Sequence, residues 1–533
     1  MRRSRGHADA RMDAVALEVL RHALAAVAEE MNANLVRAAF SPNIKERRDC
    51  SCAVFAGTGE MVAQAESIPV HLGAMPFAVR QAVAVIGRLE DGDVVVVNDP
   101  YDGGAHLPDL TFVSPLIVDG RVIALAASRA HHADIGGKEP GSVAGDARDI
   151  FQEGLRIPPV KLWRRGEADT DLLRMILRNV RTPEERNGDL NAQRAACQTG
   201  VRRLRTLADR YGVPPLCAGM DAVLAYAERR MRQEIAALPD GTAAYRDVLD
   251  DDGAGGDEVP IAVAVNIRGD HMELDFAGSA PQVRGPLNAV AAVTHSACYY
   301  AVREITDPTI PANDGCYRPL AIVLPPRSVV HAEAPAAVVG GNLETAQRIA
   351  DCVLGALFRL VPQRAVAASQ GTMNNVAVGG IYPRTGAAYT LYETNGGGMG
   401  AGPNADGEDG IHSHMTNTMN TPIEALEMAY PLRVERYELL EGSGGSGRHR
   451  GGRGIRRDIT IVGHRARISL LGDRRVHRPW GLHGGGPGAA GEDVVLRGGE
   501  VVPLPSKGTA TLGPGDTLSI RTPGGGGYGA PAP

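Results

Sequence analysis

Apolar residues recur every three or four positions in several long stretches of the first half of the chain. In residues 13–39, leucine, valine and methionine follow this spacing, which predicts the buried face of a long amphipathic helix. The same spacing predicts helices at 75–89, 169–179, 183–210 and 214–238. On the strongly charged helix at 183–210 we expect three side chains on a polar face rather than at a functional site: Asp189, Gln193 and Arg194.

Shorter apolar runs bounded by turn residues predict strands. Residues 93–97 form one such run. Residues 262–267 and 272–276 alternate apolar and polar positions on either side of Arg268-Gly269-Asp270, so we expect them to pair as a hairpin. Helical spacing then returns at 288–305.

Residues 340–345 open a further predicted helix, which runs through Leu360. The side chain of Asn342 or Thr345 is placed to cap its first turn. The last third of the chain consists of short strands and turns rich in glycine and arginine.

A chain of 533 residues is too long for one hydrophobic core. We expect a multidomain α+β protein with antiparallel sheets, long helices and a strand-rich C-terminal part. The pattern divides it into a disordered tail at 1–12, an N-terminal domain at 13–258, a central α/β domain at 259–440 and a C-terminal region at 441–533.

Charge and composition exclude several classes of function. The net charge is −6 and aromatic residues make up 4% of the chain, which argues against nucleic-acid binding. No apolar run is long enough to span a bilayer, and the arginine-rich start lacks the apolar core of a signal peptide. The seven cysteines are scattered without a Cys-x-x-Cys pair, as in reduced cytosolic proteins. We therefore expect a cytoplasmic protein that does not bind membranes.

Two polar islands interrupt the apolar pattern at residues 98–109 and 129–137. Apolar runs within residues 112–127 join them and turn at Asp119-Gly120, which predicts a hairpin. A hairpin places its two ends side by side. The two islands would then bring five side chains together: His106, Asp109, His131, His132 and Asp134.

Imidazole and carboxylate groups are the ligands that Zn, Mn or Fe accept, and two or three of them with an open position make a catalytic metal site. The same residues also fit a cluster of hydrogen-bonded polar loops, because His-x-x-Asp is a short pattern and Asp-Gly-Gly is ordinary turn chemistry. The residue pattern alone leaves both interpretations open. Asp49 enters a strand from a charged stretch and on its own indicates only a solvated turn.

The whole chain resembles the hydantoinase B/oxoprolinase family, which comprises the B subunits of ATP-dependent N-methylhydantoinases and 5-oxoprolinases. Acetone carboxylase alpha subunits are larger relatives. The matching motifs occur in family order at 40–47, 69–73, 98–109, 131–137, 340–345, 370–375, 443–452 and 523–529.

The resemblance implies one divalent metal ion, which is Zn, Mn, Fe or Co. Its ligands in the family are an Asp, a His-x-x-Asp pair and a later His. In this sequence the last three are His106, Asp109 and His131, with Asp49 as the fourth. Ser67 is a departure, because many relatives are expected to have His there.

The resemblance also suggests how a metal-bound water is used. Asp134 or His132 is placed to accept its proton. His132 could instead replace His131 as the ligand, because adjacent residues on a strand point to opposite faces.

The chain contains no P-loop, because its glycine-rich run at 396–400 lacks the Lys-Ser/Thr that follows one. In the family a separate A-type subunit, or an A-type half of a fused chain, binds ATP and phosphorylates the substrate carbonyl oxygen. We therefore expect the metal-bearing B subunit of a hetero-oligomeric cyclic amidase that opens a hydantoin or lactam ring. One alternative is an acetone-carboxylase-like subunit, although the large extra C-terminal region expected there is missing. Another is a non-catalytic scaffold that docks an ATPase subunit.

Overall fold

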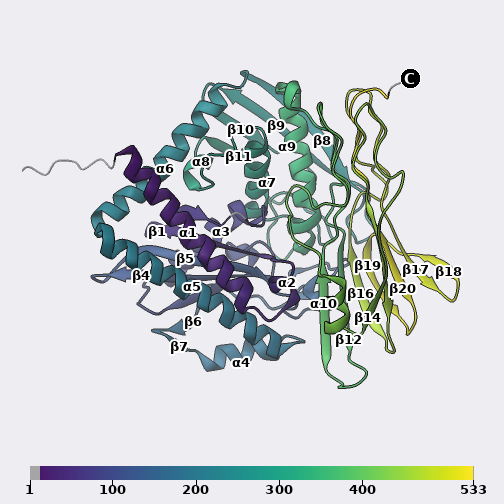
Figure 1. Cartoon of the computed structure of the whole chain (residues 1–533), viewed down its shortest axis with the longest axis horizontal. Helices are drawn as coiled ribbons and strands as arrows, with labels where there is room; N and C mark the ends of the chain where they lie inside the picture. The colour runs from purple at the N-terminus through teal and green to yellow at the C-terminus, as the bar shows by residue number, and fades with distance from the viewer. Residues whose placement is uncertain (1–12, 66, 532–533) are drawn as a thin grey trace, which may run out of the picture.

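The computed structural model describes residues 13–65 and 67–531, and it combines long helices with four sheets that are almost entirely antiparallel (Figure 1). The predicted multidomain α+β class is confirmed. The predicted tail at 1–12 lies outside the described residues. No helix in the described part of the chain is long and apolar enough to cross a membrane.

A seven-stranded antiparallel sheet forms the centre of the N-terminal half, in the order β2-β1-β5-β4-β3-β6-β7. Alternate residues of its central strands belong to two separate hydrophobic cores, one on each face. Its strands are β1 (Cys50–Ala56), β2 (Met61–Gln64), β3 (Val94–Val97), β4 (Asp109–Val118), β5 (Arg121–His131), β6 (Val160–Arg164) and β7 (Glu167–Ala168).

Helices cover both faces of this sheet (Figure 1). Helices α1 (Ala14–Ala38) and α5 (Pro183–Tyr211) pack on one face, and α3 (His71–Ile86) packs on the other. The Asp13 carboxylate caps α1 by accepting a hydrogen bond from the backbone N–H of Ala16. The long helix predicted at 13–39 is therefore confirmed.

Two of the three side chains expected on the polar face of α5 are buried. Asp189 and Gln193 are fully buried, because the helix lies on the sheet with these polar groups facing inward. Asp189 accepts hydrogen bonds from the backbone N–H groups of Phe40 and Ser41, and Gln193 donates to the carbonyl of Leu110. A charged helix can thus carry its polar residues into the core where the loops beneath it supply partners.

The second sheet has the order β11-β10-β9-β8, and α9 covers it. Its strands are β8 (Gly241–Leu249), β9 (Val259–Arg268), β10 (His271–Asp275) and β11 (Leu320–Val323). The predicted pairing around Arg268-Gly269-Asp270 is confirmed by the register of β9 and β10. The helices nearby are α6 (Val213–Ala236), α7 (Ala291–Glu304), α8 (Asp314–Tyr317) and α9 (Ala346–Leu360).

The remaining two sheets pack face to face around one core. One sheet contains β13 (Ala388–Glu393), β12 (Asn375–Ile381), β16 (Ala466–Leu471) and β19 (Lys507–Leu512) in that order. The other contains β14 (Leu432–Leu439), β15 (Ile455–Ile461), β20 (Thr517–Arg521), β17 (Glu492–Arg497) and β18 (Glu500–Pro503). Short helices complete the chain: α2 (Pro42–Lys45), α4 (Thr170–Arg178), α10 (Ile423–Ala429), η1 (Pro100–Asp102), η2 (Pro140–Ser142), η3 (Ile150–Gln152), η4 (Gly341–Thr345) and η5 (Pro362–Arg364).

Pairing between strands crosses both domain boundaries placed from the sequence. Strand β8 lies before residue 259 and pairs with β9 after it, and β12 lies before residue 441 and pairs with β16 after it. Those divisions therefore separate strands that share hydrogen bonds.

The predicted cap of the helix through Leu360 was also wrong. Gly341–Thr345 is a single π-helical turn that runs directly into α9 without a side-chain cap. The Thr345 hydroxyl instead donates a hydrogen bond to the carbonyl of Leu287. Such π turns inside helices often occur at functional sites, and Asn342 and Leu343 of this turn line the cavity described next.

Candidate metal centre

The β4–β5 hairpin predicted from the sequence is present and brings the two polar islands together. Asp109 is the first residue of β4 and lies directly opposite His131, the last residue of β5. His106 stands three residues before Asp109 in the loop that enters β4. The pairing of the two strand ends thus fixes the relative positions of all three side chains.

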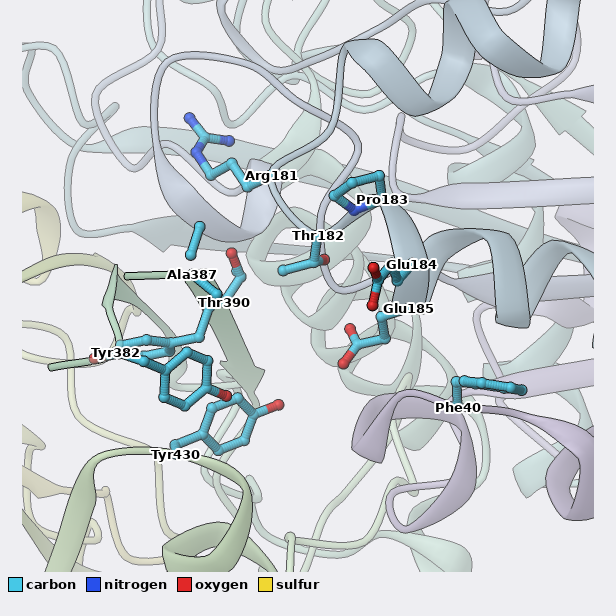
Figure 2. Close-up of a pocket in the computed structure, with 12 residues that line it drawn as sticks. Phe40, Arg181, Thr182, Pro183, Glu184, Glu185, Tyr382, Ala387, Thr390 and Tyr430 are labelled. Atoms are coloured by element: carbon cyan, nitrogen blue, oxygen red, sulfur yellow. The ribbon is translucent and has the colours of Figure 1, made fainter. Parts of the chain in front are cut away.

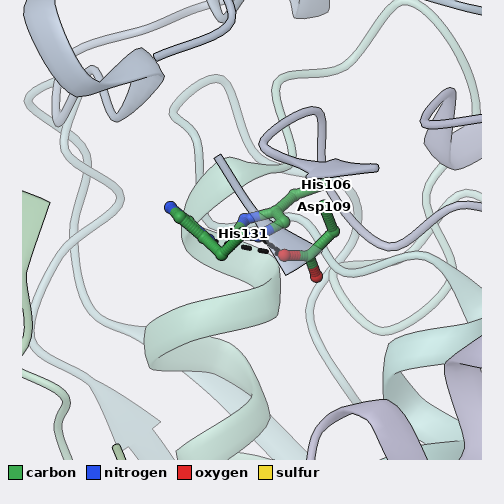
Figure 3. A group of neighbouring side chains, drawn as sticks. All are labelled: His106, Asp109 and His131. Carbon is green, nitrogen blue, oxygen red and sulfur yellow. Dashed lines mark ion pairs between the residues drawn. The ribbon is translucent and has the colours of Figure 1, made fainter. Parts of the chain in front are cut away.

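The three side chains form one compact donor group (Figure 3). The Nε2 atom of His106 lies 3.0 Å from Oδ1 of Asp109, and Nδ1 of His131 lies 3.4 Å from the same oxygen. Donors on a tetrahedral Zn²⁺, each about 2.05 Å from the ion, are about 3.3 Å apart. The spacing therefore fits a shared divalent ion.

The burial of these three side chains explains why a bound cation would stabilise them. His106, Asp109 and His131 are all buried. Within residues 13–65 and 67–531, both ring nitrogens of His106, Nε2 of His131 and Oδ2 of Asp109 have no partner in hydrogen-bond geometry. Buried polar atoms without partners are costly, and coordination to a cation would satisfy several of them at once.

Two further polar side chains reach the same cavity. Asp49 precedes β1 and lines the cavity together with Asp109 and His131, and its backbone carbonyl accepts a hydrogen bond from the N–H of His131. His71 opens α3, with Nε2 3.5 Å from Oδ2 of Asp109 and Nδ1 2.7 Å from the hydroxyl of Ser51. Sequence reasoning placed Asp49 here but missed His71, although the motif at 69–73 contains it.

The electrostatics favour the forms that bind metals. Burial acts to raise the pKa of the Asp109 carboxyl, but the neighbouring His106, His131 and His71 outweigh it and hold that pKa well below its usual range. Burial lowers the pKa of His131 although Asp109 and Asp49 oppose the change. An ionised carboxylate beside a neutral imidazole is the ligand state of both groups.

The wall behind His131 comes from the second half of the chain. The imidazole of His131 stacks on the ring of Tyr392 in β13, with centroids 4.4 Å apart and planes at 13°. The buried guanidinium of Arg47 donates to the carbonyl of Tyr392 and to the hydroxyl of Thr394. About 20 Å³ of the enclosed cavity is open to a water-sized molecule, which is room for about one water.

The structure places His132 and Asp134 in other surroundings. His132 points to α5, where Nε2 lies 2.8 Å from Oε1 of Gln193, and burial lowers its pKa. Asp134 accepts hydrogen bonds from the backbone N–H groups of Gly136 and Arg181 and pairs with the Arg181 guanidinium at 2.8 Å. The described donor group and cavity wall include neither residue, so these contacts do not support the proton-accepting role predicted for them.

Comparisons with known proteins cover nearly the whole chain. The family model described as hydantoinase B/oxoprolinase matches residues 13–531. An uncharacterized protein of Methanocaldococcus jannaschii is 40% identical over 98% of this chain and 91% of its own. 5-Oxoprolinase 1 of Arabidopsis thaliana is 37% identical over 97% of this chain, which spans only 42% of that longer protein.

A solved structure is similar over almost the same length. The beta subunit of caprolactamase from Pseudomonas jessenii is 33% identical over 98% of this chain and 91% of its own. The crystal structure of the ATP-dependent caprolactamase from that organism superimposes with a TM-score of 0.92 at 31% identity, over 98% of this chain and 92% of that one.

Proposed function

The chain belongs to the hydantoinase B/oxoprolinase family, and on that premise we propose that it is the metal-bearing, hydrolytic subunit of an ATP-dependent cyclic amidase. The observation that carries the proposal is the buried group of His106, Asp109 and His131, whose donor atoms have the spacing of a shared ion. A scaffold that only docked another subunit would have no need of such a group.

In this proposal His106, Asp109 and His131 hold one divalent ion, and Asp49 is a fourth side chain at the same cavity. A bound ion of this kind lowers the pKa of its water and polarises an oxygen. His71 is the proposed proton acceptor, because it lines the same cavity and the hydroxyl of Ser51 holds its Nδ1, which leaves Nε2 directed at the cavity. The Tyr392 ring fixes the plane of His131 by stacking.

The substrate ring needs more space than the metal cavity provides. A second cavity, of about 370 Å³, adjoins the first through the side chain of Ile68, which lines both. Ser51, the partner of His71, also lines this second cavity. We propose that the ring lies there, with the carbonyl to be attacked directed at the metal cavity.

The relatives support a divided enzyme. The matched part of the Arabidopsis 5-oxoprolinase is about two-fifths of that protein, and the caprolactamase chain is named as one subunit of its enzyme. We infer that this chain acts with an A-type subunit that binds ATP and activates the carbonyl oxygen. An ion held by His106, Asp109 and His131 would supply the activated water for attack on that carbonyl carbon.

The test is to purify the chain together with an A-type subunit and to screen 5-oxoproline, hydantoin, N-methylhydantoin and caprolactam for ring opening with and without ATP. The expected result is ATP-dependent opening of at least one ring, with about one metal ion per chain. Carboxylation of acetone in place of ring opening would select the carboxylase alternative. A complex without bound metal or product would select the scaffold.

A further inference from the structure

A separate cavity of about 590 Å³ opens between the N-terminal turn of α5 and the β12–β13 hairpin (Figure 2). Glu184 and Glu185 lie on one wall, and Tyr382 and Tyr430 lie on the other. Tyr389 also lines the cavity. In the described part of the chain this cavity shares no lining residue with the metal cavity. Its volume is that of a small-ligand site, and the hydrolytic proposal makes no use of it.

The cavity wall carries uncompensated negative charge. Its only cationic lining residue among those described, Arg181, is already paired with Asp134 and donates to the carbonyls of Gly136 and Gly137. Behind the wall Arg186 pairs with both Asp189 and Glu185, each at 2.7 Å. The carboxylates thus outnumber the two arginines, because Asp134, Asp189, Glu184 and Glu185 all lie at or behind this wall.

One of those carboxylates retains a free oxygen. Oε1 of Glu185 accepts a hydrogen bond from Arg186, whereas Oε2 has no hydrogen bond to any described residue. Burial raises the pKa of this carboxyl although Arg186 lies beside it. A further cation in the cavity would therefore stabilise the ionised form of Glu185.

The opposite wall supplies a hydroxyl without a partner. Tyr430 is only 6% exposed, and no described residue forms a hydrogen bond with its hydroxyl, which points across the cavity toward Glu185 (Figure 2). The hydroxyls of its neighbours are engaged, with Tyr389 bound to His464 and Tyr382 to the carbonyl of Ala429. The Tyr430 hydroxyl is therefore free for a ligand that enters the cavity.

The tyrosine rings add an attraction for positive charge. The ring centroids of Tyr382 and Tyr389 are 5.2 Å apart, and those of Tyr389 and Tyr430 are 5.7 Å apart. The faces of aromatic rings attract cations and also accommodate alkyl chains. The cavity thus presents acceptors on one side and an aromatic surface on the other.

We propose that this cavity binds a primary alkylammonium group. Its three N–H donors match the carboxylates of Glu184 and Glu185 and the hydroxyl oxygen of Tyr430, while its carbon chain lies on the tyrosine rings. The group belongs either to a free amine or to a lysine side chain of the partner subunit. The chemistry of the site is the same for both sources.

Calorimetric titration of the full-length, metal-loaded chain with n-butylammonium chloride tests the proposal, with 1-butanol as the neutral control of equal size. Butylammonium should bind at least tenfold more tightly than 1-butanol. Glu185→Gln and Tyr430→Phe should each weaken the binding of butylammonium by roughly three- to tenfold. Asp209→Asn removes one exposed charge from the same helix and should leave binding unchanged.

Titration of the complex with the A-type subunit distinguishes the two sources. Retained binding assigns the site to free amines. Loss of binding, together with weaker assembly of the Glu185→Gln complex, assigns it to a lysine of the partner. If Glu185→Gln destabilises the fold by removing a charged partner of Arg186, Tyr430→Phe still tests the proposal, because it keeps the ring and removes only the hydroxyl. Equal binding of butylammonium and 1-butanol by the free chain, or full binding by both variants, would overturn the proposal.

Discussion

At the scale of single residues, the register of one hairpin determines how the proposed metal ligands are arranged. The Asp109–His131 pair closes β4 against β5, so a shift of one residue would turn one of these side chains to the opposite face of the sheet. His132 illustrates the effect, because it follows His131 directly and faces Gln193 on α5. The sequence could place the two ends of the hairpin together because two apolar runs flank the turn residues Asp119-Gly120.

The first prediction distinguishes the proposed metal ligands from neighbouring side chains. His106→Ala and Asp109→Ala should each lower metal content and abolish ring opening, because each removes a donor from the group. The A-type subunit of the complex should still bind ATP, since ATP binding and ring opening use different sites. His132→Asn is the matched control and should keep its metal. Full metal content in both ligand variants, measured by elemental analysis, would remove these residues from the site.

A second prediction concerns Asp134. The residue is fully buried and accepts three backbone hydrogen bonds, from Gly136, Gly141 and Arg181, besides pairing with the Arg181 guanidinium. Asp134→Asn should therefore keep its metal and lose about 1–3 kcal/mol of unfolding free energy. Urea unfolding and metal analysis on one preparation check this. A rate lowered 10²-fold or more at unchanged stability would restore the proton-accepting role predicted from the sequence.

Other residues of the centre could not be predicted from the sequence pattern. His71 and Tyr392 reach the cavity only because α3 and β13 pack against the end of the hairpin, and β13 begins 257 residues after β5 ends. Local periodicity does not encode contacts over such separations. The sequence thus predicted the donors that one hairpin positions and missed those that tertiary packing supplies.

At the scale of elements, close approach of two helices positions His71. Gly73 lies in the first turn of α3, and a Cβ atom there would come within 2.8 Å of the Tyr299 ring and 2.9 Å of the Ser296 backbone nitrogen in α7. The Gly73 N–H donates to the Ser296 hydroxyl, which donates to the carbonyl of Val70. Helix α3 thus lies against α7 without space for a side chain.

Gly73→Ala should therefore lower the free energy of unfolding by about 1–3 kcal/mol, because overpacking forces α3 away from α7. The measurement is urea unfolding of the metal-loaded chain. Replacing Tyr299 by Leu in the same background should recover part of the loss, since the two changes share one contact. Additive losses in the double variant would show that the ring contact is not the cause.

A second prediction at this scale concerns the link between Glu153, which directly follows η3, and the segment that leads into η4. Glu153 is fully buried, and its carboxylate accepts hydrogen bonds from the backbone N–H groups of Val338 and Val339. Burial raises its pKa from 4.5 to about 8 despite these donors. The folded state therefore holds a proton that the unfolded state releases above about pH 4.5.

The stability contributed by this proton is fully present below about pH 4.5 and is lost as pH rises toward 8. Between pH 5 and pH 8 the wild type should lose on the order of 3 kcal/mol more unfolding free energy than Glu153→Gln, which cannot ionise. Denaturant titrations of both proteins at the two pH values check this. Parallel pH dependences would show that Glu153 does not bind the proton.

At the scale of the whole molecule, the centre lies where separate parts of the chain converge. Asp109 and His131 belong to the first sheet and Asp49 directly precedes its strand β1, whereas other parts of the cavity wall come from η4, β13 and residues 415–418. The alternation of helices and strands predicted the α+β class and most elements. It could not predict that sheets cross the expected domain boundaries, because pairing between distant strands leaves no local pattern.

The last prediction concerns dependence on a partner. The isolated chain should hydrolyse no ATP and open little or no cyclic amide, because its glycine-rich turn at 396–400 lacks the residues of a P-loop. Addition of the A-type subunit should restore both activities through an interface of about 2,000 Å² or more. ATP turnover and product are to be measured on each subunit alone, on the complex and on the complex with His106→Ala. That last complex should consume ATP without product or stall with a phosphorylated intermediate. ATP hydrolysis by the pure single chain, abolished by a substitution within it, would contradict the division of labour.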